Sequence, residues 1–270
     1  MLNREPKERF SAAADLYGRY RPSYPAALRD FLYELLPPAG GTPSAVPTIA
    51  DLGCGTGIST RLVAGPNVRV IGIDPNREML AEAARTTPAE LAIEYRQGEA
   101  TTTGLPAQSV DLVTVAQAFH WFDIEPTLDE LARILIPGGR CAVYWNLREQ
   151  DGSPFLSAYD ALLLRYSSEY DQVPSGEQLL AALSAHPRLR PIRTADLPNL
   201  QPLDHQGFFG RVYSSSYVTH GVAAAERPAF DAALEELFAR HAREGEVNFA
   251  YRTRALAFEI AADPPARERD

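Results

Sequence analysis

Hydrophobic residues in the first half of the chain follow two different spacings, and together they predict a sheet covered by helices. Short, almost unbroken apolar runs are typical of strands buried on both faces. They cover residues 49–52, 68–73, 91–96, 110–116 and 140–145. Between them, segments with helical spacing cover about residues 58–64, 75–85 and 125–135. Strands that alternate with helices in this way predict a parallel sheet with helices on both faces.

Two further regions flank this alternation. Before it, an apolar stripe of Leu28, Phe31, Leu32 and Leu35 predicts a helix that starts near Pro25, a suitable first-turn residue. A Gly- and Pro-rich linker follows over residues 37–47. After the alternation, we expect helices over residues 154–166, 176–186, 207–216 and 223–243, and strands over 191–203 and 248–260.

These elements predict one structural domain of the α/β class, built on seven mostly parallel strands. We expect four parts within it. They are an N-terminal helical lid (1–45), a cofactor-binding core (46–147), a helical insertion or cap (148–192), and a C-terminal part (193–270) that completes the sheet and forms a wall of the substrate pocket.

Composition narrows the possible partners. The 270 residues are 45% hydrophobic and 23% charged, which is ordinary for a globular protein with a sizeable core. The net charge of −9, without a dense Lys/Arg block, argues against a general grip on nucleic acid. No apolar stretch approaches the roughly 20 residues of a membrane span, and the charged residues 1–10 do not form a signal peptide. We therefore expect a cytoplasmic protein, a monomer or homodimer, that binds neither nucleic acid nor a membrane.

The two cysteines add little. Cys54 and Cys141 lie far apart and predict neither a disulfide framework nor a zinc site, so no metal is expected.

The strongest local motif is a run of alternate glycines, Gly53, Gly55 and Gly57, directly after the first strand. Glycine tolerates positive φ and lets a ligand approach the backbone, and the helix that follows offers unpaired N–H groups. Dinucleotide-binding loops follow G-x-G-x-x-G, but here Ile58 stands where the third glycine would be. The spacing disfavours NAD without excluding it.

Two acidic residues suggest what the loop holds. Asp74 ends the second strand, where a carboxylate reaches a pair of ribose hydroxyls, although an Asp there could also cap a helix. Asp51 precedes the glycines and suits a ligand that carries a cation. We therefore interpret the glycine loop as the binding site of a cationic ligand that carries a ribose. The alternatives are an NAD-dependent oxidoreductase and a catalytically silent cofactor-binding protein.

At this point the chain resembles a known family. Asp51-Leu52-Gly53-Cys54-Gly55-Thr56-Gly57, with Asp74 after the next strand, resembles the class I S-adenosylmethionine-dependent methyltransferases. Gly98-Glu99-Ala100 resembles their G-D-A loop, with Glu where Asp is usual. Asp111-Leu112-Val113 and Pro137-Gly138-Gly139 match the later motifs in order and spacing.

A narrower resemblance lies outside this core. Arg21-Pro22-Ser23-Tyr24-Pro25 and Ala116-Gln117-Ala118-Phe119-His120-Trp121-Phe122 are similar to the subgroup related to trans-aconitate methyltransferase, which acts largely on small molecules.

The resemblance implies a Rossmann-like fold and S-adenosyl-L-methionine as cofactor, with S-adenosyl-L-homocysteine as its product. It implies that Gly53 and Gly55 pass beneath the methionine part and that Asp51 faces its amino group. Tyr17 and Arg21 would close over the cofactor, with Arg21 a candidate partner for its carboxylate.

Around the nucleoside, the resemblance implies that Asp74 holds the ribose hydroxyls and that Pro75-Asn76 lies beside the adenine. Glu99 and the backbone of Ala100 would contact the adenine edge. Gln117, at the end of the fourth strand, would lie near the methyl group.

The methyl acceptor is less well defined. His120 follows the fourth strand, at the carboxyl edge where open α/β sheets bind ligands, and an imidazole suits a general base. The alternative is a structural histidine at a helix start. The other candidate substrate-binding residues are Trp121, Trp145, Tyr213 and Tyr217, each of which could equally serve packing. The predicted activity is methyl transfer to an oxygen or nitrogen of a small molecule.

Overall fold

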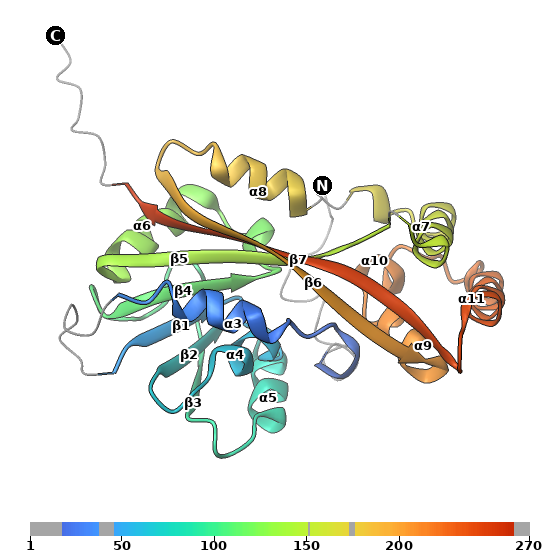
Figure 1. Ribbon diagram of the computed structural model, residues 1–270, viewed down its shortest axis with the longest axis horizontal. Coiled ribbons are helices and arrows are strands. Elements are labelled where there is room, and N and C mark those ends of the chain that lie inside the picture. The colour runs from blue at the N-terminus through green and yellow to red at the C-terminus, as the bar shows by residue number, and fades with distance from the viewer. Residues whose placement is uncertain (1–17, 38–45, 151, 173–175, 262–270) are drawn as a thin grey trace, which may run out of the picture.

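The computed structural model of the protein describes residues 18–37, 46–150, 152–172 and 176–261. One sheet contains the strands in the order β3-β2-β1-β4-β5-β7-β6 (Figure 1). Their bounds are β1 Thr48–Leu52, β2 Arg69–Asp74, β3 Ile93–Gln97, β4 Val110–Ala116, β5 Leu135–Arg148, β6 Leu189–Asp204 and β7 Glu246–Ile260. β7 is antiparallel to β5 and β6, and the pairs from β3 to β5 are parallel. The predicted fold class, with seven mostly parallel strands, is confirmed.

Helices cover both faces of the sheet (Figure 1). On one face, Leu28 and Leu32 of α3 (Ala26–Tyr33) and Val63 of α4 (Ile58–Val63) pack in one buried cluster with Tyr144 of β5. α5 (Arg77–Thr86) links β2 to β3. On the other face, α6 (Ile124–Ile134) and α8 (Gly176–Ser184) join a second cluster, to which α8 contributes Leu183.

A third group of helices lies where β6 and β7 extend beyond the other strands (Figure 1). They are α7 Pro154–Tyr166, α9 His205–Tyr213, α10 Ser216–Thr219 and α11 Arg227–His241. Their aromatic side chains, among them Phe155, Phe208 and Phe230, pack around Phe249 of β7 in a separate core. The molecule therefore has a region of helices and aromatic residues next to the sheet edge where β5 ends.

Local sequence explains where several helices begin. The side chain of Asn76 accepts a hydrogen bond from Met79 N at 3.1 Å and caps α5. Ser153 caps α7 through Leu156 N, and Pro154 occupies its first turn, where a missing N–H costs nothing. Asp204 caps α9 through Gly207 N at 2.7 Å.

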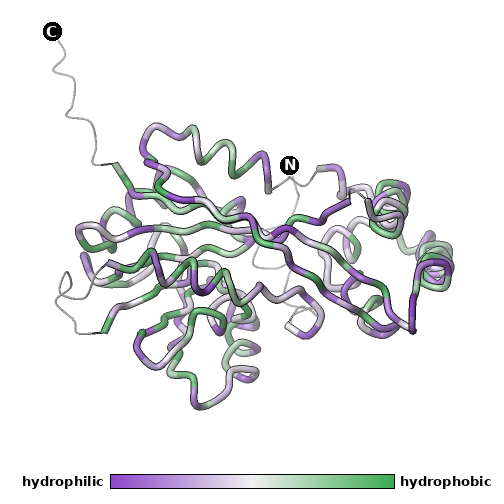
Figure 2. Tube along the Cα trace, in the orientation of Figure 1, coloured by the Kyte–Doolittle hydropathy of each residue, from purple (hydrophilic) through white to green (hydrophobic). Residues whose placement is uncertain are grey.

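The hydropathy pattern follows these layers. Figure 2 shows apolar residues along the central strands and polar residues at many of the turns between elements. β4 is buried over Val110–Val115, as a strand covered on both faces should be. The helix expected over residues 125–135 ends at Ile134, because Leu135 already pairs with Val110 at the start of β5. Within the described residues, no helix has both the length and the apolar character needed to cross a bilayer.

Candidate functional site

The glycine loop joins β1 to α4 at the carboxyl edge of the sheet, and all three glycines have positive φ. A Cβ on Gly53 (φ +66°) would come within 2.7 Å of the Ala118 Cβ, and one on Gly57 (φ +78°) would overlap the Tyr95 hydroxyl. Gly55 (φ +53°) differs, because a Cβ there would meet no atom within 4 Å. Packing therefore requires Gly53 and Gly57, whereas Gly55 borders open space.

Gly55 also lines a cavity of about 50 Å³ beside the loop. Four of the predicted cofactor residues line this cavity: Arg21, Gly53, Gly55 and Gln117. Its lining also includes Tyr24, Thr56 and Ser59, which the sequence analysis did not single out for cofactor binding. The Thr56 hydroxyl is buried and has no hydrogen-bond partner among the described residues, so the loop offers an unused polar group.

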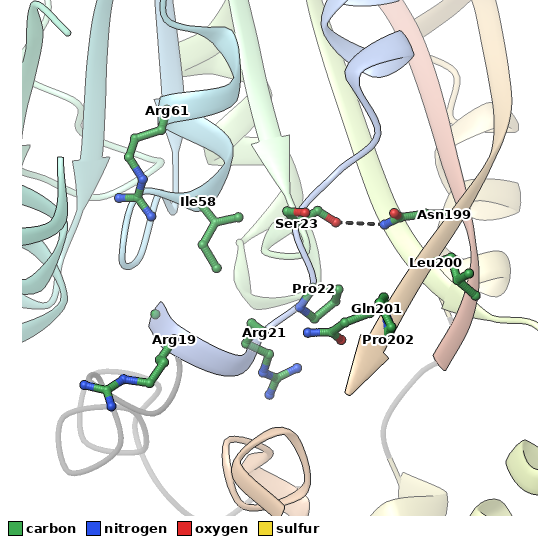
Figure 3. A pocket seen from close by; sticks show the side chains of 11 residues that line it. Arg19, Arg21, Pro22, Ser23, Ile58, Arg61, Asn199, Leu200, Gln201 and Pro202 are labelled. Atoms are coloured by element: carbon green, nitrogen blue, oxygen red, sulfur yellow. Dashed lines mark hydrogen bonds between the residues drawn. The ribbon is translucent and has the colours of Figure 1, made fainter. Parts of the chain in front are cut away.

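A larger cavity of about 450 Å³ lies beside the first and shares Arg21, Pro22 and Ile58 with it. Figure 3 shows Arg19 and Arg21 on the N-terminal segment and Arg61 on α4 around this cavity. No Asp or Glu is among the described residues that line it. The electrostatics of this cavity therefore favour a negatively charged group.

The N-terminal segment is held over the site by β6. Asn199 donates to the Ser23 carbonyl at 2.8 Å, and Gln201 donates to the Tyr20 carbonyl at 2.9 Å (Figure 3 shows the first of these). Arg21 itself donates to the Ser214 carbonyl at 3.0 Å. Part of the predicted lid is thus fixed by hydrogen bonds between side chains and backbone carbonyls. Tyr17, the other predicted lid residue, lies outside the described residues.

Asp74 is 9% exposed and connects the glycine loop to the start of α5. Its Oδ2 accepts from Gly55 N at 2.9 Å, and its Oδ1 accepts from Asn76 N at 2.8 Å. Burial raises the pKa of Asp74, although the two N–H groups lower it in part. The α5 cap comes from Asn76, and the Asp74 carboxylate lies against Gly55, which lines the cavity.

Asp51 is fully buried, and its carboxylate faces three hydroxyl groups. Thr60 and Thr114 donate at 2.7 and 2.8 Å, and Ser59 donates at 3.3 Å. Burial raises the pKa of Asp51 to about 6, which these hydroxyl groups lower only in part. In the structure Asp51 therefore fastens α4 and β4 to the end of β1. Its predicted contact with the amino group of the cofactor stays a prediction.

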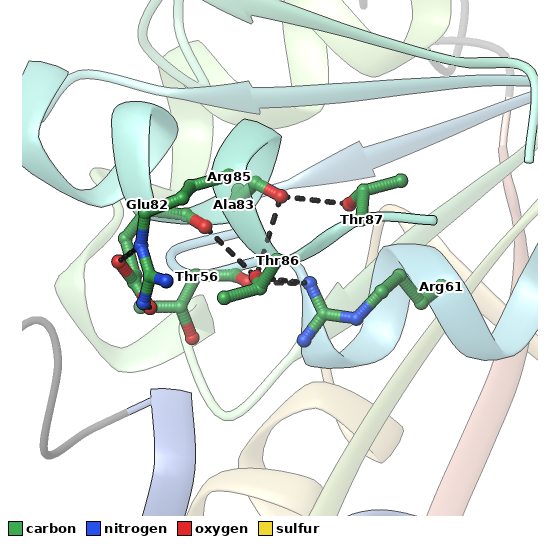
Figure 4. A network of polar contacts seen from close by, with 7 residues as sticks. All are labelled: Thr56, Arg61, Glu82, Ala83, Arg85, Thr86 and Thr87. Carbon is green, nitrogen blue, oxygen red and sulfur yellow. Dashed lines mark hydrogen bonds and ion pairs between the residues drawn. The ribbon is translucent and has the colours of Figure 1, made fainter. Parts of the chain in front are cut away.

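A second polar network holds the outer side of the loop (Figure 4). Arg61 donates to the Thr56 carbonyl at 2.8 Å and to the Thr86 hydroxyl at 3.1 Å, and Thr86 donates to the Glu82 carbonyl at 2.8 Å. These bonds connect the glycine loop to the last turn of α5. The loop is consequently fixed before any ligand binds.

The region predicted for the adenine edge adjoins Asp74. Gly98 N donates to the Asp74 carbonyl at 3.2 Å, and Glu99 pairs with Thr102 in an isolated bridge. The Glu99 side chain is exposed, and the partly buried Ala100 packs against the main core, which is the buried cluster that includes residues of α6 and α8. Pro75 is half-buried between Asp74 and the α5 cap. These positions lie together, and their contacts with adenine remain predictions.

Gln117 and His120 follow β4. Gln117 has φ +55°, unusual for a residue other than glycine, and its N–H donates to the Tyr144 carbonyl at 2.9 Å. His120 lies in a short 3₁₀ turn, Phe119–Trp121, with its ring 4.8 Å from that of Trp121. Burial lowers the pKa of His120 to about 4, so the imidazole is neutral near pH 7 and only a weak base.

The predicted substrate residues separate into different places. Trp145 is 4% exposed in the main core and packs beside Gly176 at the start of α8. Tyr213 donates to Asp231 between α9 and α11. Tyr217 lies beside Arg148, whose guanidinium donates to its hydroxyl at 3.2 Å. Trp145 and Tyr213 are thus in packed surroundings, whereas Tyr217 belongs to a polar cluster described below.

The central part of the chain is similar to known methyltransferases. Residues 50–143 match the family model described as a methyltransferase domain. An uncharacterized methyltransferase of Mycobacterium tuberculosis is 39% identical over 142 residues, 52% of this chain and 53% of that protein. The trans-aconitate 2-methyltransferase of Azoarcus sp. is 38% identical over 99 residues, 36% of this chain and 38% of that protein. The narrower subgroup resemblance is therefore only partial.

A solved structure supports the fold over a longer span. A protein of Anaeromyxobacter dehalogenans, named as a candidate type II methyltransferase, has a TM-score of 0.67 and 24% identity. The similarity covers 90% of this chain and 99% of that one, and it shows a shared fold.

Residues 50–143 are thus similar to a methyltransferase domain, for which the sequence predicts S-adenosylmethionine as cofactor. The chain spans about half the length of the curated relatives it matches.

The residues present fit that cofactor. Asp74 uses one lone pair of each oxygen for backbone N–H groups, which leaves acceptor sites for two ribose hydroxyls. Gly55 leaves room for close approach, and the neighbouring arginine-lined cavity suits a carboxylate. Within the described residues, no group of three His, Cys, Asp or Glu could hold a metal ion.

Proposed function

We propose that this protein is an S-adenosylmethionine-dependent methyltransferase that methylates an oxygen or nitrogen atom of a small molecule. The observation that carries the proposal is the hydrogen bond from Gly55 N to Asp74 within a methyltransferase domain. It holds a carboxylate against Gly55, which lines the small cavity, while the face of Gly55 that lacks a side chain stays open. A nucleoside at this place needs both features.

The chain's own residues divide the binding of the cofactor. Asp74 accepts the ribose hydroxyls, and the Glu99-Ala100 turn with Pro75-Asn76 forms the adenine side. Arg21 binds the carboxylate of the cofactor within the arginine-lined cavity. Its position in the lining of both cavities supports this role. Gln117 borders the same space from the end of β4.

The bound cofactor supplies an electrophilic methyl group on a sulfonium. The protein then contributes mainly alignment of the acceptor atom and exclusion of water. His120 is a weak base because burial lowers its pKa to about 4. An acceptor that is already ionised, such as a carboxylate or phenolate, requires no base, whereas a protonated amine or an alcohol would.

A small acceptor is favoured by the size and charge of the site. The cavity of about 450 Å³ falls in the range of roughly 300–1,000 Å³ that is usual for small-molecule pockets. The net charge of −9 gives no general attraction to nucleic acid.

The proposal is tested by activity on defined mixtures. Purified protein is incubated with S-adenosylmethionine and pools of small carboxylic acids, phenols and amines. Mass spectrometry then follows formation of S-adenosylhomocysteine and of products that gain CH2. Methylated product that requires the wild-type chain supports the proposal. Tight cofactor binding with no product from any pool would favour a catalytically silent cofactor-binding protein.

A further inference from the structure

Two arginines and four tyrosines lie together where β5 ends, next to helices α7, α9 and α10. They are Arg148, Arg211, Tyr159, Tyr170, Tyr217 and Tyr251. Arg148 is the last residue of β5 and pairs with Tyr251 on β7. Arg211 lies on α9 and Tyr217 on α10. The position is the carboxyl edge of the parallel sheet, which is where open α/β sheets bind ligands. The proposed cofactor residues do not include this cluster.

The cluster has more positive than negative charge. Arg211 is 4% exposed and donates to the Tyr251 hydroxyl at 3.1 Å and to Ser215 Oγ at 2.9 Å, and no carboxylate among the described residues forms an ion pair with it. Arg148 lies 3.6 Å from Asp160, a carboxylate that Tyr170 also contacts. The cluster therefore contains two guanidiniums and one carboxylate, and in the described part of the chain that carboxylate forms an ion pair with Arg148 alone. Such buried charge is costly unless a counter-charge is available.

A buried hydroxyl in the same place has no partner. Tyr159 on α7 is 0% exposed, and the Arg148 guanidinium lies 5.3 Å from the centre of its ring. Its hydroxyl forms no hydrogen bond with any described residue. Since buried polar atoms in folded proteins are nearly always paired, this oxygen marks unused capacity to hold a ligand.

Tyr217 explains how the cluster is tolerated without a ligand. Burial raises the pKa of its phenol, but Arg148, Arg211 and Arg21 outweigh burial and lower that pKa to about 7. Near neutral pH the phenol therefore ionises, and its oxygen accepts a hydrogen bond from Arg148. The phenolate supplies the missing negative charge. Asp160 is the carboxylate that faces the cluster from α7, and the hydroxyl groups of Tyr170 and Tyr251 also face it.

Arg21 joins this cluster to the glycine loop. It lines the cavity above Gly55, donates to the Ser214 carbonyl between α9 and α10, and is close enough to Tyr217 to lower its pKa. A molecule anchored in the cluster would thus lie next to Arg21, which also lines the cavity at Gly55.

We propose that Arg148, Arg211 and the Tyr159 hydroxyl bind a carboxylate group of the methyl acceptor, and that Tyr217 acts as an internal counter-ion that this carboxylate replaces. The proposal rests on the proposed function, because the carboxylate belongs to the acceptor. When the carboxylate enters, Tyr217 takes up a proton from solvent and the net charge of the cluster is unchanged. A carboxylate fits better than a phosphate dianion, because the cluster exchanges one negative charge.

Calorimetry with succinate, benzoate and inorganic phosphate as probes tests this directly. The protein is saturated with S-adenosylhomocysteine and titrated in two buffers of different ionisation enthalpy. At about pH 8 we expect a carboxylate probe to bind with uptake of about one proton, and the uptake should fall toward zero at about pH 6. Tyr217→Phe should bind the same probe without this proton uptake, whereas a purely structural tyrosine would leave the uptake equal in the two proteins.

Variants locate the site. Arg148→Gln and Arg211→Gln should each weaken binding of the probe about tenfold or more, whereas Arg165→Gln, an exposed arginine on α7, should leave it unchanged. Because Arg211 is buried, each variant is first checked for an unchanged affinity for S-adenosylhomocysteine. Probe binding without proton uptake, or equal affinity for phosphate, would overturn the proposal. If S-adenosylhomocysteine itself does not bind, the proposed function fails instead.

Discussion

The open face of Gly55 gives a sharp test of where the cofactor lies. Gly55→Ala places a Cβ at a residue with φ +53° where no protein atom lies within 4 Å. The left-handed conformation costs an alanine about 1–2 kcal/mol. In a chain of this size we expect the melting temperature to fall by about 2–8 °C. The protein should fold, because nothing in it has to move.

The same methyl group should strongly impair cofactor binding. It would project at the cavity shared by Gly53, Gly55 and Gln117, and overpacking of this kind costs about 1–3 kcal/mol. We expect the dissociation constant for S-adenosylhomocysteine, measured by calorimetry, to rise about 5- to 150-fold.

Gly138 provides a matched control. It has φ +80°, a Cβ there would also meet nothing within 4 Å, and it lies in β5 rather than in the loop. Gly138→Ala should lose a similar amount of stability and keep its affinity for S-adenosylhomocysteine. Gly53→Ala should lose more stability than either, because its Cβ would lie 2.7 Å from the Ala118 Cβ. Equal affinities of the Gly55 and Gly138 variants would refute the placement of the cofactor above Gly55.

Three further predictions follow from the same site. Burial raises the pKa of Asp51 from 3.8 to about 6, so its protonated form favours folding below about pH 4, and this stabilisation, about 3 kcal/mol, is lost as pH rises through 6. Asp51→Asn should remove that pH-dependent part from urea-unfolding free energies measured between about pH 4 and 7; parallel curves for the two proteins would contradict it. Asp74→Asn turns an amide N–H toward the backbone N–H of Gly55 or Asn76, and an unpaired donor there costs about 1–3 kcal/mol. The affinity for S-adenosylhomocysteine should therefore fall at least about fivefold. An unchanged affinity would contradict this prediction. His120→Ala should lower kcat less than about tenfold and leave its pH profile in place, because a group with a pKa of about 4 is a poor base; a loss above about a hundredfold with a shifted profile would restore the general-base role.

Local patterns in the sequence were sufficient for most of the fold. The buried run Val110–Ala116 and the helical stripe of Leu28, Phe31 and Leu32 are each visible within a few residues. Gly53 and Asp74 could likewise be placed at one site, because parallel strands end at the same edge of a sheet. These features depend on periodicity and chain direction, which a sequence states directly.

Other features depend on contacts between distant segments and could not be predicted. Arg148 and Arg211 meet only after β7 pairs with β5 and α9 packs against the sheet end. The left-handed conformation of Gln117 has no local sequence cue, since glycine or Asn would be usual there. Trp145 was a candidate for the substrate pocket because it ends an expected strand. Its burial beside Gly176 became visible only when α8 was placed on the sheet.

The central claim, that the glycine loop binds S-adenosylmethionine, is tested most directly by calorimetric titration of the wild-type protein. S-adenosylmethionine and S-adenosylhomocysteine are each titrated at equal protein concentration, with NAD as the competing nucleotide. We predict one site per chain, micromolar or tighter affinity for both sulfur-containing ligands and no measurable heat with NAD. Saturable binding of NAD, with none of S-adenosylmethionine or S-adenosylhomocysteine, would contradict the account.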